Sequence, residues 1–271
     1  MALTFRKLHP HFVGESSPVE LRKAHDEETL AQIRAGMDEF AVLVFHDQAF
    51  SDAEQLAFGQ RLDGRLHQGT GSRAFTKSRL DNEALSDISN LAANGEIMKA
   101  DDRRRHYTLG NRLWHTDASF VDPPGRYSML HARVVPPVPA DTEFADMRAA
   151  YDALPADMKA QLEGLRAHHS VAYSRHVLGF EFSAEEQEKL KGAIHPLVRT
   201  IPRSLRRSLY LASHQSRIVD WPIPEGRLLL RDLMEHATHR ARPFDDAKYR
   251  RELRRVTTLD IAQPAFAAAG S

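Results

Sequence analysis

Residues 114–120 read Trp-His-Thr-Asp-Ala-Ser-Phe, and the interpretation of the whole chain starts from this stretch. In an extended segment, side chains i and i+2 project to the same side, so His115 and Asp117 can offer an imidazole nitrogen and a carboxylate to one metal ion. A distant second histidine would complete the two-histidine, one-carboxylate triad of non-haem Fe(II) oxygenases, which leaves three coordination positions open. The spacing alone is weak evidence, because a chain with 15 histidines contains about one His-x-Asp by chance. The alternative is a polar pair at the end of a strand.

The composition argues against several other classes of protein. Of the 271 residues, 37 are Lys or Arg and 37 are Asp or Glu, so the chain lacks the positive excess of a dedicated nucleic-acid or polybasic membrane-surface protein. No apolar run approaches the roughly 20 residues that span a bilayer, and the first ten residues carry no apolar signal segment. Cysteine is absent, which removes disulfides and thiolate metal sites. We therefore expect a cytoplasmic protein without nucleic-acid or membrane partners.

Hydrophobic periodicity predicts a single α+β domain over residues 1–271 with a mainly antiparallel core. The expected helices cover residues 26–40, 146–154, 155–165 and 225–237, and the expected strands cover 41–45, 87–91, 126–135, 209–213 and 255–261. Ser51 to Glu54 and Ser183 to Glu186 have the capping-box pattern, so each predicts the start of a helix. Residues 64–82 are polar and contain glycine, which predicts a long loop beside a functional site.

Three segments resemble the TauD/TfdA family of dioxygenases, which use Fe(II), 2-oxoglutarate and O2. Residues 110–120, Gly-Asn-Arg-Leu-Trp-His-Thr-Asp-Ala-Ser-Phe, resemble the metal motif of the family. Residues 136–151 resemble its Gly-Gly-Asp-Thr stretch and the helix that follows. Residues 239–245 and 250–258 resemble the segment with the second metal histidine and the carboxylate-binding arginines. Order and spacing agree from about Leu8 to Asp260, and the resemblance implies a double-stranded β-helix (jelly-roll) core with flanking helices.

The resemblance also implies roles for individual residues. The iron ligands would be His115, Asp117 and His239. The distal carboxylate of 2-oxoglutarate would be held by Thr142 and Arg251, and the substrate side would include Asn111, the amide of Ala118 and Arg255. An arginine fork pairs bidentately with a carboxylate and a threonine hydroxyl adds one donor, which suits the co-substrate. The alternative for residues 250–255 is a solvated basic face.

The remaining histidines are weaker candidates. His67 lies in the polar loop, where it is more readily explained as a loop residue than as a substrate contact. For His168, His169 and His214 we expect packing or hydrogen-bonding roles rather than metal coordination.

Two departures from the family pattern bear on the site. Pro139-Ala140 stands where these enzymes carry Gly-Gly, so the turn before Thr142 must differ locally. Thr238 runs directly into His239, whereas the family has a strand pair between the preceding helix and this histidine, so roughly two dozen residues are absent, enough for two strands and their turns. We expect that an internal segment is left out of the sequence here, in which case the two Cα atoms will not lie one trans peptide, about 3.8 Å, apart. A real deletion would leave a misfolded or iron-free protein.

The closest resemblance within the family is to the branch that opens the ether of aryloxyalkanoates. It implies oxidation beside the ether oxygen of (S)-2-phenoxypropionates such as dichlorprop, giving a phenol and a keto acid together with succinate and CO2. The alternatives are a sulfonate or alkyl-anion dioxygenase of the same family and a non-catalytic relative that only binds ligand. A zinc hydrolase is weaker, because no general base is evident. Assembly into a homo-oligomer stays open.

Overall fold

The computed structural model describes residues 2–68, 78–234, 239–241 and 243–260, and for 239–241 the backbone only. The helices are α1 (Glu27–Phe40), α2 (Asp52–Asp63), α3 (Arg103–Thr108), α4 (Met147–Ala153), α5 (Ala156–Leu162), α6 (Val171–His176), α7 (Ala184–Lys189) and α8 (Ile223–Met234), with 3-10 turns η1 (Leu21–Lys23) and η3 (Leu109–Arg112). The strands are β1 (Phe5–Lys7), β2 (Gly14–Ser16), β3 (Leu43–Val44), β4 (Leu85–Ser89), β5 (Gly125–Val134), β6 (Thr142–Phe144), β7 (Arg166–His169), β8 (Ala193–Pro196), β9 (Val198–Thr200), β10 (Arg207–Leu209), β11 (Gln215–Ile218), β12 (His239–Ala241) and β13 (Glu252–Leu259).

The strands form small sheets with the orders β1-β2-β3, β9-β10, β8-β7-β11, β6-β12 and β4-β13-β5. Every strand pairing is antiparallel except that of β2 with β3. This confirms the predicted mixed α+β class with a mainly antiparallel core. In the described residues no sheet exceeds three strands, so the predicted jelly roll is present only as fragments.

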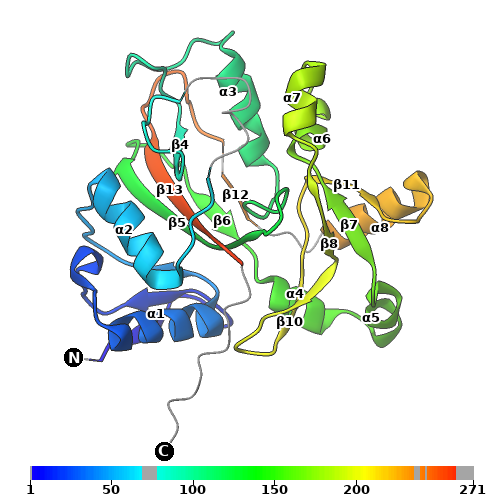
Figure 1. The fold of residues 1–271 in the computed structure, drawn as a ribbon, viewed down its shortest axis with the longest axis horizontal. Coiled ribbons are helices and arrows are strands. Elements are labelled where there is room, and N and C mark those ends of the chain that lie inside the picture. Colours follow the sequence, from blue (N-terminus) through cyan, green and yellow to red (C-terminus); the bar gives the residue numbers. More distant parts are fainter. Residues whose placement is uncertain (1, 69–77, 235–238, 242, 261–271) are drawn as a thin grey trace, which may run out of the picture.

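The sheet β4-β13-β5 has β13 at its centre, and it carries the site. In β13, Arg255 pairs with Leu130 and Thr257 pairs with Ser128. Side chains alternate across a strand, so these residues share one face of the sheet. Val256 is fully buried on the other face, where helix α2 covers the sheet and a Cβ on Gly59 would lie 2.8 Å from Val256 (Figure 1). The face that α2 leaves free is therefore the one available to ligands.

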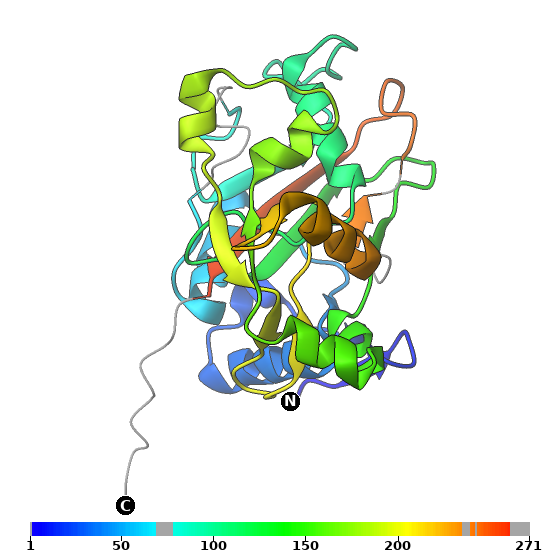
Figure 2. The same ribbon diagram turned by 90° about the vertical axis from the view of Figure 1, so that its right-hand side faces the viewer.

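Two apolar clusters flank this sheet. One joins α1, α2 and β5, and its members include Leu30, Ile33, Phe58 and Tyr127. The other lies around β7, β10 and β11 and is covered by α8, which crosses in front of these strands in Figure 2. Burial of leucine side chains in the second cluster stabilises the sheet from which residues 211–214 reach the candidate site.

The local predictions were mostly confirmed. Ser51 and Ser183 accept from the N–H of Glu54 and Glu186 in complete capping boxes, and Asp26 caps α1. The strand predicted at 41–45 is wrong in extent, because Ala41 adopts φ +60° and ends α1, leaving only Leu43–Val44 extended. Pro155 is the residue before α5 rather than in its first turn.

The other boundaries differ by a few residues. The strand predicted at 209–213 is β10 at Arg207–Leu209, and the helix predicted at 225–237 is α8, which ends at Met234. In the described part of the chain, no helix is long and apolar enough to cross a bilayer.

Candidate active site

Residues 117–120 form a turn, so the extended segment expected from the sequence does not continue past Thr116. Ala118 adopts φ +51°, a left-handed conformation that reverses the chain directly after Asp117. The two predicted metal ligands still meet, with His115 Nε2 3.6 Å from Oδ1 of Asp117. His115 Nδ1 donates to the carbonyl of Leu113 at 2.7 Å, so in the neutral ring Nε2 carries the lone pair. This tautomer is the one a metal-binding histidine requires.

A second segment, residues 211–214, holds the turn in place. The N–H of Ser213 donates to Trp114 O at 2.9 Å, and the Thr116 hydroxyl donates to Leu211 O at 2.6 Å. The ring of His214 packs against that of His115, with 5.8 Å between centroids. Burial and then the nearby Arg175 charge lower the pKa of His214 far below its usual value. His214 is therefore a neutral packing partner, as expected from the sequence.

Asp117 is held over the free face of the β4-β13-β5 sheet. The Ser128 hydroxyl donates to its Oδ2 at 2.6 Å, and the guanidinium of Arg255 donates to its Oδ1. The strand register places Arg255 and Ser128 on the same face, so both reach one carboxylate. The predicted metal ligand and the predicted substrate arginine are thus in direct contact.

Arg251 and Thr142 also come together, as the sequence predicted. Arg251 Nη2 lies 3.5 Å from Thr142 Oγ1, although 109 positions separate the residues. Burial lowers the pKa of the Arg251 guanidinium, and no carboxylate of the described residues pairs with it. Arg251 precedes Arg255 by four residues along extended chain, so both face the same side. A half-buried guanidinium and hydroxyl without an acidic partner fit the carboxylate of a ligand such as 2-oxoglutarate.

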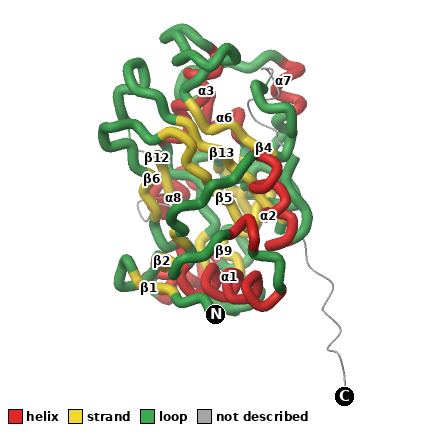
Figure 3. The backbone as a smooth tube through the Cα atoms, turned by 90° about the vertical axis from the view of Figure 1, so that its left-hand side faces the viewer, coloured by secondary structure: helices red, strands yellow, loops and turns green. Residues whose placement is uncertain are grey.

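The third predicted ligand, His239, is described by its backbone alone. Strand β12 pairs with β6, placing His239 opposite Phe144 and Ala241 opposite Thr142 (Figure 3). Its side chain lies outside the described residues, as does Thr238, so neither the triad nor the Thr238–His239 distance is tested. Among the side chains that are described, no third histidine, aspartate or glutamate joins His115 and Asp117 in a metal-binding cluster.

The two remaining predicted residues flank the turn. Asn111 lies in η3, and its side-chain oxygen accepts from Arg175 at 3.2 Å. Ala118 is buried, and a Cβ on Gly125 would lie 3.1 Å from its Cβ, so the backbone packs closely under the turn. Ala118 directly follows Asp117, and Asn111 precedes His115 by four residues. Contact of either residue with substrate stays a prediction.

Sequence reasoning missed or undervalued three contributors. Burial and then the positive charge of Arg255 lower the pKa of His67, which Asp117 raises, so this histidine lies beside the site. The only indication in the sequence that His67 lies near the site was its position in the predicted polar loop. Ser128 and Arg175 gave no signal, because their partners are distant in sequence.

Comparisons with known proteins agree with this geometry. Residues 4–255 match the family model described as taurine catabolism dioxygenase TauD, TfdA family. The chain is 40% identical over 287 residues to the alpha-ketoglutarate-dependent 2,4-dichlorophenoxyacetate dioxygenase of Cupriavidus pinatubonensis, covering 97% of this chain and 99% of that protein. It is 32% identical over 221 residues to the (S)-phenoxypropionate/alpha-ketoglutarate-dioxygenase of Sphingobium herbicidovorans, covering 78% and 71%. The crystal structure of AAD-2 with Mn(II) and N-oxalylglycine superposes with a TM-score of 0.88 at 41% identity, covering 96% of this chain and 98% of that one.

The first of these alignments is longer than the chain. It spans 287 positions, whereas 97% of 271 residues fills only about 263 of them, so about 24 positions have no residue of this chain.

Proposed function

Because this chain belongs to the TauD/TfdA family of 2-oxoglutarate-dependent dioxygenases, we propose that it oxidises an aryloxyalkanoate anion and so cleaves its ether bond. The observation that carries the proposal is the arrangement on one face of the β4-β13-β5 sheet. There His115 and Asp117 lie beside Arg255, and Arg251 lies beside Thr142. One face thus offers metal-binding groups and two cationic positions for carboxylates.

In this proposal the ligand sites follow from the chemistry of the side chains. His115 and Asp117, with His239 as third ligand, would hold Fe(II). Bound iron, with 2-oxoglutarate and O2, would supply the oxidising chemistry, in which one oxygen atom of O2 goes to succinate, the other goes to the substrate, and CO2 is released. Arg251 and the Thr142 hydroxyl would bind and orient the distal carboxylate of 2-oxoglutarate.

Arg255 would orient the substrate carboxylate. Since the carbon beside that carboxylate also bears the ether oxygen, holding the anion at Arg255 keeps this carbon next to His115 and Asp117. Hydroxylation there gives a hemiacetal, which collapses to a phenol and a 2-oxo acid: an aldehyde acid from a phenoxyacetate and a keto acid from a 2-phenoxypropionate. The chain's own contribution is position, orientation and exclusion of water.

The similarities favour one substrate over the other. The 2,4-dichlorophenoxyacetate dioxygenases of Cupriavidus and Burkholderia are 40% and 39% identical to this chain, against 32% for the (S)-phenoxypropionate enzyme. We therefore propose phenoxyacetates such as 2,4-dichlorophenoxyacetate as the first substrates to test. The (S)-2-phenoxypropionates expected from the sequence come second.

We also propose that the core is an incomplete jelly roll that lacks a strand pair between Thr238 and His239. Four residues connect the end of α8 to the start of β12, and about 24 positions in the whole alignment have no residue of this chain, a number that would supply two strands and their turns. Such a gap explains why the described sheets have two or three strands, since each strand of a jelly roll pairs with neighbours that come from elsewhere in the chain. It also supports the second candidate, a relative that binds ligand without turning it over.

One experiment separates these functions. Anaerobic protein is mixed with Fe(II) and 2-oxoglutarate, the weak visible charge-transfer band is recorded, and 2,4-dichlorophenoxyacetate is added. A band that shifts with substrate, followed on exposure to O2 by phenol and succinate, supports ether cleavage. A band that the anion does not shift contradicts the proposed substrate. Absence of a band together with binding of the anion favours the non-catalytic relative.

A further inference from the structure

Arg175 in α6 is a deeply buried cation without an acidic partner. Its side chain is 3% exposed, yet no carboxylate of the described residues pairs with it. Two other arginines at similar depth do have carboxylates: Arg148 pairs with Asp146, and Arg254 pairs with Glu252. Buried charges are normally paired, so the uncompensated guanidinium of Arg175 calls for a functional explanation.

The guanidinium of Arg175 donates hydrogen bonds to three uncharged oxygen atoms. Nε donates to Tyr107 O at 3.0 Å, Nη1 to Ser174 Oγ at 3.1 Å and Nη2 to Asn111 Oδ1 at 3.2 Å. Its Cζ also lies 4.5 Å from the ring centroid of Tyr107, a cation–π distance. Each of the three guanidinium nitrogens is therefore held by one hydrogen bond.

The Arg175 guanidinium approaches the backbone of η3 closely at Gly110, which has no side chain. A Cβ on Gly110, the residue before Asn111, would lie 2.1 Å from Cζ of Arg175. The guanidinium therefore rests directly on η3, the turn that leads into His115. Of the twenty residue types, only glycine permits this approach.

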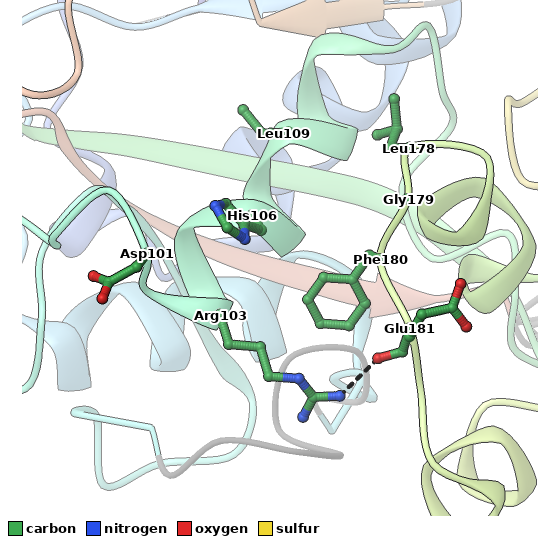
Figure 4. Close-up of a pocket in the computed structure, with 8 residues that line it drawn as sticks. All are labelled: Asp101, Arg103, His106, Leu109, Leu178, Gly179, Phe180 and Glu181. Carbon is green, nitrogen blue, oxygen red and sulfur yellow. Dashed lines mark hydrogen bonds between the residues drawn. The ribbon is translucent and has the colours of Figure 1, made fainter.

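The elements that Arg175 joins face each other across a hollow. A cavity of about 600 Å³ lies between α3 and residues 178–181, with Leu109, Leu178 and Phe180 in its wall (Figure 4). In the wall of the cavity Arg103 donates to Glu181 O at 2.9 Å, and outside that wall the buried Arg175 donates to Tyr107 O at 3.0 Å. Through its buried side chain, Arg175 thus connects α6 to helix α3 and to turn η3, which contains Asn111.

The contact with Asn111 has a chemical consequence. A guanidinium has no acceptor, so only the side-chain oxygen of Asn111 can face it, and the NH2 group of the planar amide must point away from Arg175. Asn111 precedes His115 by four residues. Burial, and after it the charge of Arg255, lowers the pKa of the Arg175 guanidinium. Arg175 therefore fixes the orientation of the Asn111 amide and turns its NH2 group, in the 3-10 turn that leads to His115, towards a different acceptor.

We propose that Arg175 is a positioning residue, which fixes the Asn111 side-chain amide with its NH2 group donating to the bound substrate anion. This inference rests on the proposed function, because it takes the substrate to be an anion bound at Arg255. Arg175 itself touches no substrate atom.

The chain suits a direct test, because it contains four asparagines, at positions 82, 90, 94 and 111. Protein labelled with 15N at asparagine shows four side-chain NH2 groups, and the Asn111→Asp variant assigns one of them. In the ligand-free wild type we expect two well-separated proton signals for Asn111. In Arg175→Lys and Arg175→Gln we expect them to shift and broaden, while Asn90, whose NH2 donates to Asp246 O and Tyr249 O, stays unchanged.

The ligand arm uses Zn(II) in place of Fe(II), 2-oxoglutarate, and 2,4-dichlorophenoxyacetate as the probe. We expect the anion to shift the Asn111 NH2 signals of the wild type and of Arg227→Gln, but not those of the Arg175 variants. Arg227, in α8, is the matched control. Its Cζ lies 5.2 Å from the ring centroid of Tyr173, a residue of α6 like Arg175. Unchanged Asn111 signals in ligand-free Arg175 variants would overturn the positioning role.

The two proposals fail in different ways. If calorimetry shows that wild type binds the anion but Asn111 does not respond, the inference is wrong and the proposed function stands. If no anion binds, the proposed substrate and the donation to it both fall, and the ligand-free arm still decides the positioning role. In active protein, Arg175→Lys should raise KM for the anion about tenfold and leave kcat nearly unchanged, and Asn111→Ala should add little to that effect. Additive effects would contradict the coupling.

Discussion

The guanidinium of Arg255 forms an ion pair with the carboxylate of Asp117, although 138 positions separate the two residues in sequence. The pairing follows from the register of β13 against β5, which points Arg255 and Ser128 at the same carboxylate. The residue proposed to hold the substrate anion therefore touches a residue proposed to hold the metal. Binding at one of these positions must affect the other, and the first predictions use this contact.

Loss of either described metal ligand should abolish metal binding. We expect His115→Ala and Asp117→Asn to weaken Fe(II) or Mn(II) binding more than about 100-fold, since each removes a direct ligand. Ser128→Ala is the graded control, because it removes only the hydrogen bond to Oδ2 and should cost about tenfold or somewhat more. Calorimetric titration with Mn(II) measures all three. Equal affinity of His115→Ala and wild type would refute the proposed site.

Substitutions of Arg251 and Arg255 should raise the KM of different substrates. We expect Arg255→Gln to raise KM for the aryloxyalkanoate by about 10- to 100-fold and to leave KM for 2-oxoglutarate unchanged, and Arg251→Gln to do the reverse. Each loses a charge-assisted pair with a different carboxylate. Arg250→Gln, at an exposed neighbouring position, should change neither constant. If both variants altered both constants equally, the assignment of separate carboxylates would fail.

A buried carboxylate beneath the site should control acid stability. Asp87 accepts from Arg79 at 2.6 Å and from Arg104 at 2.8 Å, and it pairs with Arg254 at 3.3 Å. We expect Asp87→Asn to lower the free energy of unfolding by about 3–5 kcal/mol in urea titrations, because Arg104 loses its carboxylate and Arg79 and Arg254 then share Glu252. Asp81→Asn is the control, since Asp81 is exposed.

The same residue predicts the pH dependence. Burial opposes ionisation of Asp87, but hydrogen bonds from Arg79 and Arg104 outweigh it and lower the pKa. A lowered folded-state pKa means that this stabilisation is complete above the unfolded value of about 3.9 and is lost as the pH falls through the folded value. The Tm of wild type should therefore drop below about pH 4 more steeply than that of Asp87→Asn. Parallel curves would show that Asp87 does not carry the effect.

Restoring the proposed missing segment should strengthen metal binding. We expect insertion of the corresponding residues of the Cupriavidus relative between Thr238 and His239 to raise Mn(II) affinity by at least about tenfold, because the added strand pair would complete the jelly roll that carries His239. An insertion of the same length made of Gly and Ser is the control. Equal gains from both insertions would mean that chain length alone, and not the strand pair, was limiting.

Much of this protein could be read from local sequence. The capping residues Ser51 and Ser183, the β5 strand and the α8 helix were predicted because each depends on side chains only a few residues apart. His115 and Asp117 were found from their spacing, although the extended geometry assumed for them stops at the turn that starts with Asp117.

What only the tertiary structure decided are the contacts between distant segments. The ion pair of Arg255 with Asp117 depends on strand register, and the fork of Arg175 on Asn111 depends on how α6 packs against η3. The small extent of the sheets has the same origin, since a strand forms only where a partner strand is present to pair with it. Caps and periodicity act within one helix or strand and are written in the sequence, whereas pairing across more than a hundred residues is set by packing of the whole chain.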